Sequence, residues 1–125
     1  MRIYKEFTFE GAHFLPSAPK DHPNARIHGH SFRVRVSIDG EPDPKSGLIV
    51  HFDDLENALE DMRVTLDHNF LNNIDGLDNP TLELITKWMW DRLHNRVPGL
   101  AEIVISRDTC GEGCVYSGPG AASEG

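Results

Sequence analysis

Two segments of the chain alternate between apolar and polar residues, which is typical of half-buried β-strands. In the first segment the apolar positions are Ile3, Phe7 and Phe9, with Lys5 as an interruption. In the second segment the apolar positions are Phe32, Val34, Val36 and Ile38. Polar residues lie between these positions in both segments. Because side chains at i and i+2 share a face, each segment predicts a strand with one face in the core.

Two later segments have apolar residues at helical spacing. The first stripe consists of Leu55, Leu59, Met62 and Leu66. The second consists of Leu82, Ile85, Met89 and Leu93. Asp53 is the expected N-cap of the first helix, with Glu56 completing a variant of the capping box. Asn79 is the expected N-cap of the second, with Pro80 at its first helical position and Pro98-Gly99 at its end.

Shorter patterns complete the order of elements. Three of them predict further strands or extended segments, at residues 48–52, 101–108 and 115–117. Strands followed by two helices and then strands predict an α+β fold, an antiparallel sheet with helices on one face. Such a sheet leaves Arg33 and Arg35 facing solvent, a partner subunit or an anion. We expect one domain over residues 1–118 and a disordered tail over residues 119–125.

The composition limits the possible functions. The chain has 125 residues, a formal net charge of −8 and a pI near 5.2. Because phosphate binding needs a basic surface, this balance argues against nucleic acid or an anionic membrane as a main partner, but allows a small anionic substrate. No apolar run approaches about 20 residues, and the first residues lack the apolar segment of a signal peptide. With two cysteines, a reduced, cytoplasmic protein is expected.

Three histidines stand where the predicted strands could bring them together. His28 and His30 open the second strand at i and i+2, so they share a face, and His13 closes the first strand. Three neutral imidazoles around one point suit a catalytic Zn²⁺ that keeps one coordination position open. Alternatively, these are ordinary histidines, since the chain has seven and an HxH pattern alone is weak. The position of His13 at the end of its own strand favours the metal site.

Five separated motifs together resemble one family. They are His13, His28-Gly29-His30, Leu66-Asp67-His68-Asn69-Phe70-Leu71-Asn72, Asn79-Pro80-Thr81-Leu82-Glu83 and Asp108-Thr109-Cys110-Gly111-Glu112-Gly113-Cys114-Val115-Tyr116. With this combination, residues 4–118 resemble the 6-pyruvoyl-tetrahydropterin synthase family. The resemblance is stronger to its bacterial branch, the 6-carboxytetrahydropterin synthases of queuosine biosynthesis.

The resemblance implies a fold, an assembly and a reaction. The fold would be the tunnelling fold, a four-stranded antiparallel sheet with two helices on one face. Three subunits would close into a barrel, and two trimers would stack into a homohexamer with active sites at subunit interfaces. The protein would be a zinc-dependent lyase acting on the small-molecule substrate 7,8-dihydroneopterin triphosphate, with His13, His28 and His30 as zinc ligands. Both a 6-carboxy and a 6-pyruvoyl product remain open.

The resemblance also implies roles for residues outside the histidine cluster. Asp67 and His68 match the catalytic pair of the family, and Asp108 matches a glutamate that binds the pterin ring. Because Asp108 is one methylene shorter, the ring would have to sit deeper. Thr81 and Glu83 match positions near the pterin pocket. Taken alone, Asp67 and His68 would also suit the end of a helix, and Thr81 and Glu83 the first turn of one.

A second position, before the HGH motif, also departs from the family. Its bacterial branch has a cysteine base four residues before the HGH motif, where this chain has Asn24. An amide cannot accept a proton at neutral pH, whereas a thiolate beside zinc can. His22, at the cysteine position of the pyruvoyl branch, or Asp21 could serve instead. Two alternatives to the lyase follow: a pterin- or purine-binding homologue with lost or altered catalysis, and a zinc hydrolase. The two cysteines that are present, Cys110 and Cys114, are expected to be reduced thiols on a turn.

Overall fold

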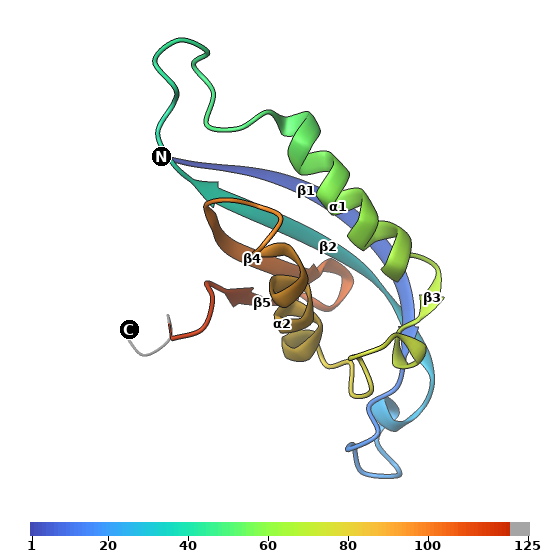
Figure 1. The fold of residues 1–125 in the computed structure, drawn as a ribbon. Coiled ribbons are helices and arrows are strands. Elements are labelled where there is room, and N and C mark those ends of the chain that lie inside the picture. Colours follow the sequence, from blue (N-terminus) through green and yellow to red (C-terminus); the bar gives the residue numbers. More distant parts are fainter. Residues whose placement is uncertain (121–125) are drawn as a thin grey trace.

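Two long antiparallel strands form the centre of the sheet. β1 (Arg2–His13) and β2 (His28–Asp39) pair along their whole length. β4 (Leu100–Arg107) continues the sheet beside β2, and β5 (Glu112–Tyr116) continues it beside β4. The computed structural model describes residues 1–120, and Figure 1 shows the curved sheet with the helices against one face.

Two helices cover the apolar face of the sheet. α1 is Phe52–Leu66 and α2 is Leu82–Leu93. Both apolar stripes are buried, and α2 also buries Trp88 and Trp90, which widens its inner face. The predicted α+β class with two helices is therefore confirmed. Within residues 1–120, neither helix is long and apolar enough to cross a membrane.

Both helices begin at other residues than predicted. α1 begins at Phe52 after His51, whose side chain makes no capping hydrogen bond. Asp53 therefore lies inside the first turn, where its negative charge interacts favourably with the helix dipole. Thr81, rather than Asn79, caps α2, because its hydroxyl accepts the backbone N–H of Leu84 at 3.1 Å. Capping depends on which side-chain oxygen reaches a free N–H, and the sequence offers two candidates on either side of Pro80.

Within the described residues the sheet has five strands and is mixed, so the prediction of four antiparallel strands is wrong. The additional strand β3 (Asn69–Phe70) pairs parallel with β1 at Gly11 and Ala12. The backbone of Glu10 holds β3 in place through the two residues that precede it. The Glu10 N–H donates to the Asp67 carboxylate, and the Glu10 carbonyl accepts the N–H of His68. A strand of two residues is too short to show an alternating pattern.

Three boundaries also differ from the predictions. Residues 48–51 form no strand, and residue 52 already belongs to α1. α2 ends at Leu93 rather than Pro98, and in the turn that follows the carbonyl of Leu93 accepts the N–H groups of both Arg96 and Val97. β5 begins three residues before the predicted last strand, since pairing with β4 includes Glu112. Most of the predicted disordered tail, residues 121–125, lies outside the described residues.

A stacked pair of phenylalanines lies between the core and the histidines. Phe9 and Phe32 face each other across β1 and β2, with ring centroids 4.6 Å apart and 1% exposure each. The Phe32 ring also contacts two histidine rings edge-on, with centroid distances of 6.1 Å to His13 and 5.7 Å to His30. The apolar core therefore ends where the histidine cluster begins.

We predict that Phe32→Ala destabilises the protein by about 3–5 kcal/mol, because it removes a fully buried ring and leaves a cavity. Urea unfolding followed by circular dichroism measures the change. Val115→Ala is the control: Val115 is 65% exposed, so a change within about 0.5 kcal/mol is expected. Equal small effects of the two variants would contradict the packing role of Phe32.

Candidate metal centre and active site

Three histidines meet at the end of the β1–β2 pair. The register places His13 directly opposite His28 and places His30 opposite Gly11, so all three side chains lie on the helix-covered face. Their ring centroids are 4.6–5.2 Å apart. One ring nitrogen of each lies within 4.8 Å of the others, which is close enough for a single metal ion. The predicted convergence of His13, His28 and His30 is present in the structure.

The hydrogen bonds of the rings leave one nitrogen of each for a metal. Nδ1 of His13 lies 2.8 Å from the carbonyl of Pro80, and Nδ1 of His28 lies 2.7 Å from the carbonyl of Arg26. A carbonyl only accepts, so these Nδ1 atoms carry the protons and Nε2 keeps its lone pair. Nε2 of His13 is buried and has no hydrogen-bond partner within the described residues. A buried imidazole lone pair without a hydrogen-bond partner fits a metal ligand.

Burial favours the neutral form of two of the three rings, His13 and His30. Desolvation lowers the pKa of His13 to about 4, and its hydrogen bond to Pro80 only partly offsets this. Desolvation, followed by the charge of Arg107, lowers the pKa of His30. Neutral imidazoles at physiological pH are the form that binds a metal ion.

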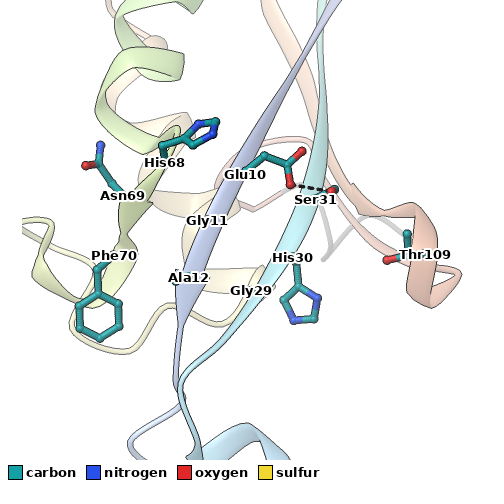
Figure 2. A pocket seen from close by; sticks show the side chains of 10 residues that line it. All are labelled: Glu10, Gly11, Ala12, Gly29, His30, Ser31, His68, Asn69, Phe70 and Thr109. Carbon is teal, nitrogen blue, oxygen red and sulfur yellow. Dashed lines mark hydrogen bonds between the residues drawn. The ribbon is translucent and has the colours of Figure 1, made fainter.

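A cavity of about 570 Å³ lies beside the histidine cluster. Figure 2 shows that His68 lies beside β1 and Thr109 lies beside β2, with His30 between them on the cavity lining. On the same lining, the Ser31 hydroxyl donates to the Glu10 carboxylate at 2.6 Å. A molecule in this cavity would therefore be in reach of imidazole, hydroxyl and carboxylate groups.

Asp67 and His68 are in direct contact. His68 Nδ1 lies 3.0 Å from the Asp67 carboxylate, which also accepts the Glu10 backbone N–H at 2.9 Å. The bond from Glu10, and then that from His68, lowers the pKa of Asp67. His68 has a φ of 56°, which is rare for a residue with a side chain, and its side chain is 79% exposed. The chain thus holds an unusual backbone conformation that presents an imidazole backed by a carboxylate.

His22 and Asn24 line a second cavity of about 300 Å³ together with Thr81. The backbone N–H of Asn24 donates to Nδ1 of His22 at 3.0 Å. A neutral His22 must then carry its proton on Nε2, so in this conformation it is a donor rather than a base. Thr81 therefore shares a cavity with the loop residues, whereas His68 shares a different cavity with His30.

The remaining predicted site residues have other partners. Asp108 accepts two hydrogen bonds from the guanidinium of Arg33, at 3.0 and 3.2 Å, which lowers the pKa of this carboxyl. The Thr81 hydroxyl accepts the N-cap hydrogen bond of α2. Glu83 lies exposed in the first turn of α2, as its position in a helix would suggest.

The chain was compared with known families and proteins. Residues 2–119 match the sequence profile of the family called 6-pyruvoyl tetrahydropterin synthase. The chain is 37% identical to 6-carboxy-5,6,7,8-tetrahydropterin synthase of Synechocystis over 94% of its own length and 93% of that protein. It is 33% identical to dihydroneopterin monophosphate aldolase of Pyrococcus furiosus over 90% of each chain. The chain belongs to the 6-pyruvoyl tetrahydropterin synthase family.

Solved structures confirm the fold of the family. The 6-pyruvoyl tetrahydropterin synthase of Caenorhabditis elegans superimposes with a TM-score of 0.82, covering 94% of this chain and 95% of that one at 22% identity. The predicted membership of the 6-pyruvoyl tetrahydropterin synthase family is therefore confirmed by both sequence and fold.

Two residues beside the histidines were missed by the sequence patterns. Arg107 pairs with Glu112 at 2.7 Å, and its Nε is buried without a hydrogen-bond partner within the described residues. Cys110 lies with its Sγ 3.9 Å from Nδ1 of His30. The β2–β4 register places Arg107 on the histidine face, the β4–β5 register pairs it with Glu112, and the turn between β4 and β5 carries Cys110. No local motif could have shown these contacts, because they depend on strand pairing.

We predict that the contribution of Asp67 to stability depends on pH. Its folded pKa is lowered, so ionised Asp67 stabilises the fold above its unfolded pKa of about 4, and this contribution is lost as pH falls through the folded pKa. Urea unfolding of the wild type and Asp67→Asn from about pH 6 to pH 3 measures this difference. The difference in unfolding free energy should be largest at the higher pH and shrink toward the lower.

Asp91→Asn, at an exposed position of α2, is the matched control. Its difference from the wild type should be small at every pH. Parallel pH profiles for the wild type and Asp67→Asn would show that the carboxylate gains nothing from Glu10 and His68.

Proposed function

We propose that this protein is a zinc-dependent lyase that acts on 7,8-dihydroneopterin triphosphate, in the manner of a 6-carboxytetrahydropterin synthase of queuosine biosynthesis. Membership in a family of tetrahydropterin synthases supports pterin-processing lyase activity. The observation that carries the proposal is the convergence of His13, His28 and His30. Within residues 1–120 the buried Nε2 of His13 has no hydrogen-bond partner, and His30 lines a cavity.

His13, His28 and His30 would hold the zinc ion. Three imidazoles suit Zn²⁺ better than the oxygen-preferring cations Mg²⁺ and Ca²⁺, and three protein ligands leave one position for substrate. A bound zinc would polarise the side-chain oxygens of the substrate and acidify the adjacent C–H and O–H groups. The two carbonyls of Pro80 and Arg26 would hold the rings in the tautomer that this requires.

Asp67 and His68 would transfer a proton. The carboxylate faces Nδ1 of His68, so it favours a proton there and stabilises the imidazolium that forms when Nε2 takes up a second one. His68 is on the lining of the same cavity as His30, which is the arrangement that proton transfer beside the zinc needs.

Asp108 would recognise the pterin ring. The ring presents parallel N–H groups that one carboxylate can accept, but Arg33 already donates two bonds to this carboxylate. Binding would therefore require Asp108 to share its oxygens or to exchange Arg33 for the ring. Thr81 could still donate its hydroxyl proton, and Glu83 would act only from the exposed first turn of α2.

We infer that the protein assembles as a homohexamer of two trimers. The edge strand β3 has two residues and the other edge, β5, has five, so both edges of the sheet offer backbone groups for pairing with a neighbour. Sites completed at subunit interfaces would allow residues that line separate cavities of one chain to act together.

A second candidate function is a pterin- or purine-binding homologue with lost or altered catalysis. The observation in its favour is the loop before β2, where Asn24 replaces the cysteine base and His22 has its Nδ1 lone pair engaged. Losing one general base costs about 10²–10⁴ in rate, whereas ligand binding does not need it.

Mass analysis of products after incubation with 7,8-dihydroneopterin triphosphate separates the two functions. We expect a 6-carboxy product from the wild type, a reduction of at least about 10²-fold for His68→Gln, and little change for the control His94→Gln. Unchanged substrate that raises the melting temperature would instead support the binding homologue. Activity that arises only in Asn24→Cys would also rule out the wild type as a synthase.

Elemental analysis of the purified protein tests the metal. We expect about one zinc per chain, lost in His13→Ala because two ligands rarely retain the ion. His51→Ala is the control, since the His51 side chain makes no capping bond and lies outside the cluster. A wild type purified in zinc-containing buffer without bound zinc would contradict the proposal.

A further inference from the structure

The thiol of Cys110 lies over the histidine cluster. Cys110 ends a short 3-10 turn, Asp108–Cys110, between β4 and β5. Gly111 follows with a φ of 67°, a conformation that lets the chain reverse at once into β5. The turn brings Sγ of Cys110 to 3.9 Å from Nδ1 of His30, within the range of a hydrogen bond to sulfur.

His30 is the one member of the cluster whose Nδ1 contacts no backbone carbonyl among the described hydrogen bonds. The carbonyls that serve His13 and His28 come from Pro80 and Arg26, which lie outside the strands and helices. Residues near His30 on β2 use their backbone groups in the pairing with β1. The partner that the structure gives Nδ1 of His30 is a side-chain atom, the sulfur of Cys110.

A histidine that binds a metal through Nε2 must keep its proton on Nδ1, and that N–H needs an acceptor. Sulfur is a weak acceptor as a thiol and a stronger one as a thiolate. The buried, unpartnered Nε2 of His13 shows independently that the cluster is built for a ligand at its centre.

We propose that Cys110 is a positioning residue of the metal centre. Its sulfur accepts the Nδ1–H of His30, selects the tautomer with a free Nε2 and completes the set of three outer partners around the three rings. This inference rests on the proposed zinc site. It differs from a role as the cysteine base, because that base belongs to the loop before β2, where this chain has Asn24.

Cys114 is the matched control in the same hairpin. It lies opposite Ile105 on β5 and is partly buried against the apolar core. Both cysteines are free, so neither variant breaks a disulfide. Because Cys110 is exposed, its replacement leaves the core intact.

Zinc affinity, measured by competition with a chromophoric chelator, tests the proposal on the whole chain. We expect Cys110→Ala to weaken zinc binding about 10- to 100-fold, as loss of an outer partner of a ligating histidine does. Cys110→Ser should recover the affinity only in part, because a hydroxyl also accepts an N–H but its shorter bond to carbon leaves the oxygen farther from Nδ1 than the sulfur. Cys114→Ala should bind zinc as the wild type does. A Cys110→Ala affinity within about twofold of the wild type would overturn the role of Cys110, while leaving the three-histidine site intact.

The cobalt-loaded protein distinguishes an outer partner from a direct ligand. We expect the wild type and Cys110→Ala to share one spectrum without a thiolate-to-cobalt charge-transfer band. A band that disappears in Cys110→Ala would show that sulfur binds the metal itself, and would overturn the positioning role. A wild type that binds neither zinc nor cobalt would overturn the proposed function, and this inference with it.

Discussion

The unbroken antiparallel register of β1 and β2 is the constraint on which the site depends. It places His13 opposite His28 and His30 opposite Gly11 at one end, while Phe9 and Phe32 stack at the next pair toward the core. A slip of one residue would turn one strand's histidines to the opposite face of the sheet. The phenylalanines favour the register in which they are buried, so the hydrophobic core itself selects the arrangement that gathers the imidazoles.

The site combines neutral imidazoles with positive charges that are paired to carboxylates. Burial lowers the pKa of His13 and His30, and the nearby positive charge of Arg107 is paired with Glu112. Arg33 and Arg35, on the face of the sheet away from the helices, are paired as well, since both donate hydrogen bonds to Glu6. Even so, the charge of Arg107 contributes to the lowered pKa of His13 and His30, which favours the neutral imidazoles that a metal ion needs.

The sequence predicted the parts of the site that follow strand periodicity. The positions of His28 and His30 at i and i+2, and of His13 at the end of the facing strand, were enough to expect the cluster. The contact between Asp67 and His68 could not be derived in the same way, because adjacent residues touch only in particular backbone conformations. Here the left-handed φ of His68 and the bonds from Glu10 create that contact, and both depend on tertiary structure.

The metal centre and the expected cysteine position belong to different structural units. The histidines are fixed by a twelve-residue strand pair and a packed core, whereas His22 and Asn24 lie on the loop that joins the two strands. Substitutions in a loop leave the pairing of the strands unchanged, so the base can change while the metal ligands stay in place. Asn24 in place of the cysteine therefore affects proton transfer. It does not affect the positions of His13, His28 and His30, which are set by the register of β1 and β2.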